Sequence, residues 1–253
     1  MCGIYFGNHL YSESSIKNKL DQISYRGPDF QGVLLKESTR FGHNRLAIID
    51  LDKRSNQPMQ YHQYTLVFNG EIYNYLALKK ELEANEVKFD TTSDTEVLLK
   101  GYAFWGDKIL DLINGMFAFA IYDEIKDKVF MARDRLGVKP LYYRWEDGIL
   151  ELCSQLGPLE TKGELDPKAI NAYLKTGYIP SPRSIYNDIK KLQPGTFASF
   201  DLTKKISTIS TYWDIEKVTP RNIPYHQAKD ELKELLQDAV KIRLRADVPN
   251  GSF

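Results

Sequence analysis

The sequence predicts an α+β fold in which strands lie toward both ends of the N-terminal part and helices lie between them. The chain begins, after Met1, with a short apolar segment at residues 2–6 that is typical of a strand. Ser93-Asp94-Thr95-Glu96 is a capping box that precedes an apolar run, and it predicts the start of a helix. Residues 116–154 contain short β-rich segments separated by turns, which predicts a series of antiparallel hairpins.

Local patterns predict the remaining elements of this part. A helix is expected over residues 18–24 and another over residues 76–85, where Lys and Glu alternate with apolar residues at helical spacing. Residues 65–68 are β-branched and aromatic, so they predict a strand, and this strand runs into Asn69-Gly70, a strong turn signal. The later strands are expected at residues 116–122, 129–132, 141–144 and 149–153.

The pattern divides the chain into a first domain at residues 1–159 and a second unit at residues 160–253. A linker is expected at residues 157–163, and a helix follows at residues 167–175. Residues 226–245 carry an apolar stripe at helical spacing that needs a partner surface. Because the sequence stops soon after this stripe, we expect the second unit to be an incomplete domain.

Composition excludes several classes of function. The 253 residues include 34 Lys and Arg and 34 Asp and Glu, so the chain lacks the basic surplus that nucleic-acid partners require. No apolar run approaches the ~20 residues that span a membrane. The two cysteines, Cys2 and Cys153, cannot build a disulfide framework, and no Cys or His pair has zinc spacing. We therefore expect a reduced, cytoplasmic protein without a metal.

Cys2 is the strongest candidate for a nucleophile. If Met1 is removed, one residue carries both a thiol and a free α-amino group, whose ordinary pKa is ~7.7–8.0. The amine can then accept the thiol proton near neutral pH, so that no separate histidine is required. The alternative is an ordinary thiol at the end of a chain.

Three further sites have a functional and a structural interpretation. Asn69-Gly70 could supply an amide side chain and a backbone N–H to an oxyanion, or could be a plain hairpin turn. Arg45 could bind a carboxylate through its planar fork, or lie on the surface beside a strand. Asp94 could hold a substrate ammonium, or only stabilise the start of a helix. His43 is interpreted as a structural hydrogen-bonding residue.

Seven motifs in register resemble the glutaminase domain of glutamine-hydrolysing asparagine synthetases, a class II (N-terminal nucleophile) glutamine amidotransferase. The resemblance covers essentially the whole chain and implies a four-layered αββα sandwich. The motifs are Cys2-Gly3-Ile4, Arg26-Gly27-Pro28-Asp29, the segment of residues 42–50 around Arg45, Asn69-Gly70-Glu71-Ile72-Tyr73-Asn74, Ser93-Asp94-Thr95-Glu96, Gly115-Met116-Phe117-Ala118-Phe119-Ala120 and Asp134-Arg135-Leu136-Gly137-Val138-Lys139-Pro140-Leu141-Tyr142.

The resemblance implies a role for each candidate residue. Cys2 matches the nucleophile that attacks the side-chain amide of L-glutamine and releases ammonia, and Asn69 and Gly70 match the oxyanion hole. Arg45 matches the group that binds the α-carboxylate of glutamine, and Asp94 matches the partner of its α-amino group. The resemblance places glutamine among Arg45, Leu46, Ala47, Ile48, Ile49, Asn69, Gly70, Glu71 and Asp94.

The chain departs from this family at its C-terminal end. There the family has an ATP-pyrophosphatase loop, Ser-Gly-Gly-x-Asp-Ser, which would follow directly after residues 248–253. We therefore expect no cofactor in this chain, and ATP and Mg²⁺ only in the missing synthetase domain, which would use the ammonia to amidate aspartate. That domain, or a second copy of the chain, is the expected partner. The alternatives are a related amidotransferase with another ammonia acceptor and an inactive truncated relic.

Overall fold

The computed structural model describes residues 1–249 and 251, and within them the strands form two six-stranded antiparallel sheets. The predicted lead into an ATP-binding loop, residues 248–253, lies partly outside the described residues. The first sheet contains, in spatial order, β10 (Lys190–Lys191), β8 (Tyr142–Glu146), β9 (Ile149–Cys153), β1 (Gly3–Gly7), β3 (Arg40–Arg45) and β2 (Phe30–Leu35). The second contains β12 (Ile206–Thr211), β11 (Thr196–Asp201), β7 (Lys128–Arg133), β6 (Gly115–Asp123), β5 (Tyr64–Ile72) and β4 (Met59–Tyr61).

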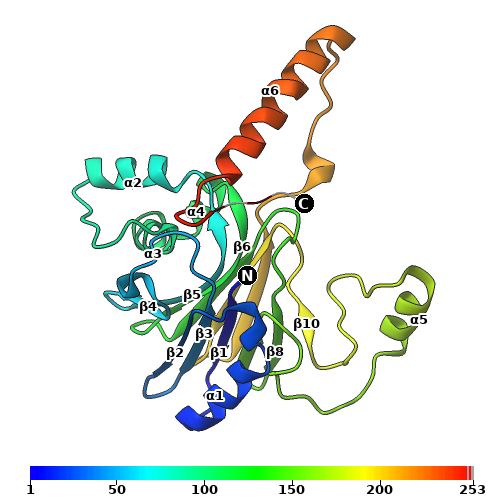
Figure 1. Ribbon diagram of the computed structural model, residues 1–253. Coiled ribbons are helices and arrows are strands. Elements are labelled where there is room, and N and C mark those ends of the chain that lie inside the picture. Colours follow the sequence, from blue (N-terminus) through cyan, green and yellow to red (C-terminus); the bar gives the residue numbers. More distant parts are fainter. Residues whose placement is uncertain (250, 252–253) are drawn as a thin grey trace.

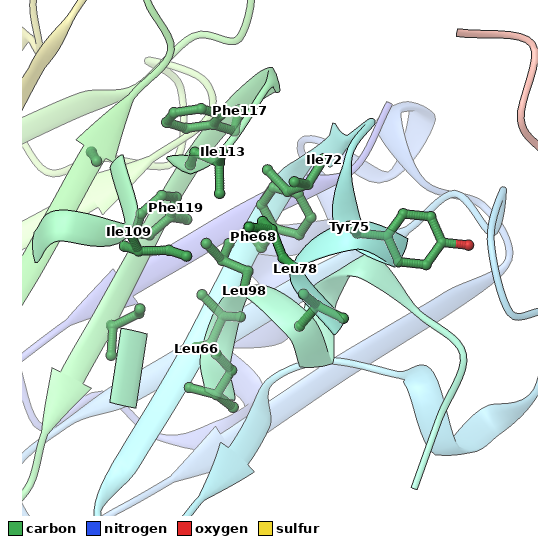
Figure 2. Packing of buried hydrophobic residues seen from close by; sticks show 14 of the residues in the cluster. Leu66, Phe68, Ile72, Tyr75, Leu78, Leu98, Ile109, Ile113, Phe117 and Phe119 are labelled. Carbon is green, nitrogen blue, oxygen red and sulfur yellow. The ribbon is translucent and has the colours of Figure 1, made fainter. Parts of the chain in front are cut away.

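Helices cover the outer faces of the two sheets (Figure 1). On the first sheet, α1 buries Ile16 and Leu20 against Tyr5 and Cys153. On the second sheet, three helices pack over β5 and β6, and Figure 2 shows their residues Leu78, Leu98 and Ile109 in one cluster with Phe68 and Phe119. The helices are α1 (Glu13–Asp21), α2 (Tyr75–Ala84), α3 (Asp94–Trp105), α4 (Ile109–Leu112), α5 (Pro167–Thr176) and α6 (Tyr225–Arg243).

A third apolar cluster fills the space between the two sheets. It joins Ile4 and Phe6 of β1 to Val67 of β5 and Ala118 of β6. The order of layers is therefore helix, sheet, sheet, helix, as the α+β sandwich prediction requires. This burial of apolar side chains on both faces of both sheets is the main source of stability.

Strand β1 lies inside the first sheet, between β3 and β9. Gly3 pairs with Asn44 of β3, and Tyr5 pairs with Cys153 of β9. Because both edges of β1 are hydrogen-bonded, the residue just before it, Cys2, has a defined position at the end of a central strand.

The turn predicted at Asn69-Gly70 is wrong, because both residues lie inside β5. There they pair with Ala118 and Phe117 of β6. A Cβ atom on Gly70 would lie 2.2 Å from the carbonyl oxygen of Met116, so only glycine allows this approach of the two strands. Cross-strand pairing along the whole of β5 overrides the local preference for a turn.

The predicted hairpins form, but they do not make one sheet. The β6–β7 hairpin belongs to the second sheet and the β8–β9 hairpin belongs to the first. Residues 134–141 make the crossing between them. Asp134 organises this loop, since its carboxylate accepts hydrogen bonds from the backbone N–H groups of Leu136, Val138 and Lys139 at 2.9–3.1 Å.

The two sheets extend beyond the predicted domain boundary at residue 159. Strand β10 pairs with β8, and β11 pairs with β7, so residues 190–211 complete the same two sheets. In contrast, α6 has no buried residue and projects away from the sheets (Figure 1). Among the described residues, no helix has the length and apolar character needed to cross a membrane.

Candidate active site

The thiol of Cys2 faces the segment that follows β3. Its Sγ accepts a hydrogen bond from the backbone N–H of Leu46 at 3.4 Å and lies 3.7 Å from the carbonyl oxygen of the same residue. The Arg26 guanidinium donates to the carbonyl oxygen of Cys2 at 2.9 Å and holds the backbone there. Burial raises the pKa of the Cys2 thiol, so a nearby base is needed to form the thiolate.

Asn69 lines the same pocket as Cys2 and presents an unpaired amide to it. Its side chain is only 1% exposed, yet neither Nδ2 nor Oδ1 has a hydrogen-bond partner among the described residues. A buried amide without a partner costs free energy, so such groups are rare in native proteins unless a ligand satisfies them. Strand pairing fixes the backbone of Asn69, and the adjacent Gly70 also lines the pocket.

Arg45, the last residue of β3, lines the pocket, but its fork is already occupied. One terminal nitrogen donates to the carbonyl oxygen of Asp52 at 3.0 Å and to Oδ1 of Asn56 at 2.7 Å. The other donates to the carbonyl oxygens of Ile49, at 3.3 Å, and Asp50. Four terminal N–H groups therefore hold the loop after β3, a role that the residue type alone does not reveal.

Asp94 reaches the pocket from the first turn of α3. Ser93 caps this helix as predicted, since its hydroxyl accepts from the N–H of Glu96 at 3.3 Å. The Asp94 carboxylate accepts from the N–H of Ile72 at 2.9 Å. Burial raises the pKa of Asp94 to about 7, and the nearby Glu71 carboxylate adds to this rise. Asp94 therefore gains and loses its charge near neutral pH.

Lys139 is a pocket residue that the sequence reasoning missed as a site residue. It is 4% exposed, and no hydrogen bond or ion pair within the described part of the chain reaches its ammonium group. Its backbone is held on both sides, because its N–H donates to Asp134 at 3.0 Å and its carbonyl oxygen accepts from Arg133 at 2.7 Å. Burial lowers the pKa of Lys139, and the Glu71 carboxylate opposes that effect.

The other candidate residues fall mostly where the resemblance implies. Glu71, Leu46, Ile48 and Ile49 line the pocket. Ala47 does not line it, and its N–H donates instead to the carboxylate of Asp29 at 2.8 Å. Thr95 and Met116 also line the pocket and lie within two of the motifs, whereas three further lining residues lie outside every motif: Ser55, Gln57 and Phe68.

His43 and Cys153 have side chains of types that often act in catalysis, but here both are packed in the interior. His43 is fully buried and contacts the carbonyl oxygen of Phe68 through Nε2 at 3.2 Å. Burial lowers its pKa to about 3, so it stays neutral near physiological pH. The Cys153 thiol lies in the apolar cluster under α1, where burial raises its pKa to about 12.

Comparison with known proteins places the chain among the glutamine amidotransferases. Residues 1–213 match the Glutamine amidotransferase domain family, and the chain belongs to this family. It is 38% identical over its full length to a Methanocaldococcus jannaschii protein named as glutamine-hydrolysing asparagine synthetase 2. It is 34% identical, again over its full length, to glutamine-hydrolysing asparagine synthetase 1 of Bacillus subtilis.

The chain spans about half the length of these relatives, 54% of the first and 42% of the second. Among solved structures, glutamine phosphoribosylpyrophosphate amidotransferase from B. subtilis has a TM-score of 0.60 at 19% identity. That match covers 84% of this chain and 49% of the other, and it supports the fold.

Proposed function

We propose that this chain is a glutaminase, in which Cys2 attacks the side-chain amide of L-glutamine and ammonia is released. The unpaired amide of Asn69 carries this proposal, because it lines one pocket with Cys2 and with the acidic group of Asp94. A buried donor without a partner is preorganised for an oxygen that gains charge during a reaction.

The first half of the reaction makes a thioester. After removal of Met1, the free α-amino group of Cys2 takes the thiol proton, and the sulfur attacks the carbonyl carbon of the glutamine side chain. Nδ2 of Asn69 and the N–H of Gly70 donate to the resulting oxyanion. The amine then passes its proton to the departing nitrogen, so that ammonia leaves as the C–N bond breaks.

The second half hydrolyses the thioester. The neutral amine takes a proton from water while the water oxygen attacks the same carbonyl carbon. The sulfur leaves and recovers a proton, which yields glutamate and free Cys2. Asp94 binds the α-ammonium of the substrate throughout, and Arg45 holds the loop that forms the wall beside its α-carboxylate.

We propose asparagine synthesis as the wider activity of the protein to which this chain belongs. The names of the two relatives and their greater length support this idea, and α6 would then open the second unit. ATP and Mg²⁺ would act there, on aspartate, rather than in the pocket described here. The proposal assigns the reaction to the reducing cytoplasm, where the Cys2 thiol stays free.

Direct assay of the purified chain tests the glutaminase proposal. Mass spectrometry should first show that the N-terminal residue is Cys2. Glutamine should then yield glutamate and ammonia in equal amounts, without ATP. An active preparation that retains Met1 would refute the role of the α-amine, and a processed chain that leaves glutamine intact would refute the proposed function.

The pH dependence of KM is expected to follow Asp94. Below its pKa of about 7 the carboxyl group is neutral and cannot pair with the substrate ammonium, so KM should rise roughly tenfold per pH unit below that value. Asp94→Asn should remove this dependence and raise KM by about tenfold to a hundredfold, as expected for loss of a charged hydrogen bond. Steady-state kinetics between pH 5.5 and 8.5 check this, and a pH-dependent KM in Asp94→Asn would assign the titration to another group.

Replacement of Lys139 is expected to move the acidic limb of the kcat profile, measured at saturating glutamine, to higher pH. Burial lowers the pKa of the Met1 α-amino group, Cys2 and Glu71 oppose this effect, and the Lys139 and Arg26 cations lower the pKa further. We expect the Lys139 cation to act in the same direction on the α-amino group of Cys2 once Met1 is removed. Lys139→Met removes one of these cations, so the limb should move up by about one pH unit, whereas Lys139→Arg should leave it in place. Superimposable profiles for wild type and Lys139→Met would contradict this role.

A further inference from the structure

The segment after α6 returns to the rim of the active-site pocket. Residues 243–247, which we call the strap, begin at the last residue of α6, a helix that otherwise stands clear of the sheets (Figure 1). The Asp247 carboxylate accepts from the N–H of Asp50 at 2.7 Å, and the N–H of Asp247 donates to the carbonyl oxygen of Ile48 at 2.9 Å. The strap is thus hydrogen-bonded to residues 48 and 50, far away in sequence.

These two residues belong to the loop that forms one wall of the pocket. Ile48 and Ile49 line it directly. Asp50 has φ of +49°, a left-handed conformation that a non-glycine residue adopts only when its surroundings hold it there. On the protein side of the loop, the Arg45 guanidinium donates to the carbonyl oxygen of Asp50. The backbone N–H and the hydroxyl of Thr92 donate to the Asp50 carboxylate at 2.7 and 3.0 Å. Asp247 supplies the contact from outside.

The strap also touches the chain where β5 leaves the pocket. The Arg243 guanidinium lies 4.7 Å from the centroid of the Tyr73 ring, and that of Arg245 lies 5.6 Å from the Tyr75 ring. Arg245 also donates to the carbonyl oxygen of Tyr73 at 3.4 Å. Tyr73 is two residues beyond Glu71, so the strap contacts two of the chain segments that carry pocket residues.

We propose that the strap is a positioning element of the glutamine site, in which Asp247 holds the loop of residues 46–50 in the conformation that binds substrate. This inference rests on the proposed glutaminase function. If the strap contacts strengthen glutamine binding, thermodynamic linkage requires that bound glutamine strengthens the strap contacts by the same free energy. Any unit that packs on α6 is thereby connected to the glutamine pocket.

Kinetics of Asp247 variants test the first direction of this coupling. Asp247→Ala should raise KM for glutamine about threefold to tenfold with little change in kcat. Asp247→Asn keeps an acceptor oxygen, so its KM should lie between those of Asp247→Ala and wild type. Asp238→Ala, which changes an exposed aspartate of α6, is the matched control and should behave as wild type. Equal KM values for Asp247→Ala and Asp238→Ala would overturn the proposal.

Limited proteolysis tests the reverse direction within a single chain. Trypsin cleaves after Arg243 and Arg245 in the strap and after Lys229 and Lys233 in the exposed part of α6. Saturating L-glutamate, the reaction product, should slow cleavage at the two strap sites about threefold or more and leave the two helix sites unchanged. Equal rates with and without glutamate at the strap sites would overturn the coupling.

A measurement without substrate separates this inference from the proposed function. Hydrogen exchange of the peptide that contains residues 46–50 should be faster in Asp247→Ala than in Asp238→Ala. If wild type does not hydrolyse glutamine but exchange is faster in Asp247→Ala, the proposed function is refuted while the positioning of residues 46–50 by the strap is supported. If wild type is active and the exchange is unchanged, the strap has no positioning role.

Discussion

Cys2→Ala is expected to reduce glutamine hydrolysis by about 10⁴-fold or more, because no other group in the pocket can form the thioester. Among the described residues, Cys153 is the other thiol, and it is buried under α1 with its pKa raised to about 12. Of the two cysteines, only Cys2 lines the pocket with Asn69 and Asp94. Ammonia release measured with the purified variant checks the loss.

The matched control is Cys153→Ala. This variant removes a buried sulfur, so it should lower Tm while kcat stays near the wild-type value. A diazo-ketone analogue of glutamine should label Cys2 and leave Cys153 unmodified in peptide mapping. Similar losses of kcat in both variants, or labelling of Cys153, would contradict the assignment of the nucleophile.

Asn69→Ala is expected to lower kcat about 10²- to 10³-fold with a smaller effect on KM, as is typical when one oxyanion donor is removed. The oxygen becomes charged only as the reaction proceeds, so the contact strengthens in the transition state and little binding of ground-state glutamine is lost. Single-turnover measurement of ammonia release would show whether the chemical step is the one affected.

Asn69→Leu separates a catalytic role from a structural one. Leucine has a similar shape and removes two buried polar atoms that have no partner among the described residues. It should therefore raise Tm while kcat falls, since the free enzyme no longer holds an unsatisfied amide. A fall in both Tm and kcat would show that Asn69 acts through the fold.

The helix caps and the central strand could be predicted from the sequence because their causes are local. Ser93 accepts from the N–H of Glu96 as the capping box requires. The Glu96 carboxylate, however, accepts from the N–H groups of Asp90 and Thr91 instead of completing the box. The Ser93 cap could be predicted because Ser93 and Glu96 lie three residues apart. The partners of the Glu96 carboxylate depend instead on how the preceding loop folds.

Features set by distant pairing could not be predicted. Asn69-Gly70 is a turn by local preference, but β6 pairs with β5 along its whole length and keeps it extended. Residues 196–201 were assigned to a second unit, although they pair with β7 in the first. In each case the competing partner lies tens of residues away, where periodicity within one segment carries no information.

The pocket shows the same division between local and distant causes. Cys2, Asn69, Gly70 and Asp94 were marked by motifs, and the fold brings all four to one pocket. The occupied fork of Arg45 depends on the path of the loop after β3, which its residue type does not specify. Lys139 belongs to the motif of residues 134–142, but it reaches the pocket only because this segment crosses from one sheet to the other.

The position of β1 has a consequence for the timing of synthesis. Its neighbour β3 is made soon after it, but its other neighbour, β9, ends at Cys153. At about 5–20 residues per second, roughly 8 to 30 s separate the synthesis of these two strands. Throughout that interval the strand beside Cys2 has one open edge, which leaves time for the proposed removal of Met1. The proposed nucleophile is thus among the first residues to be made, but the strand beside it gains its second neighbour only after residue 153.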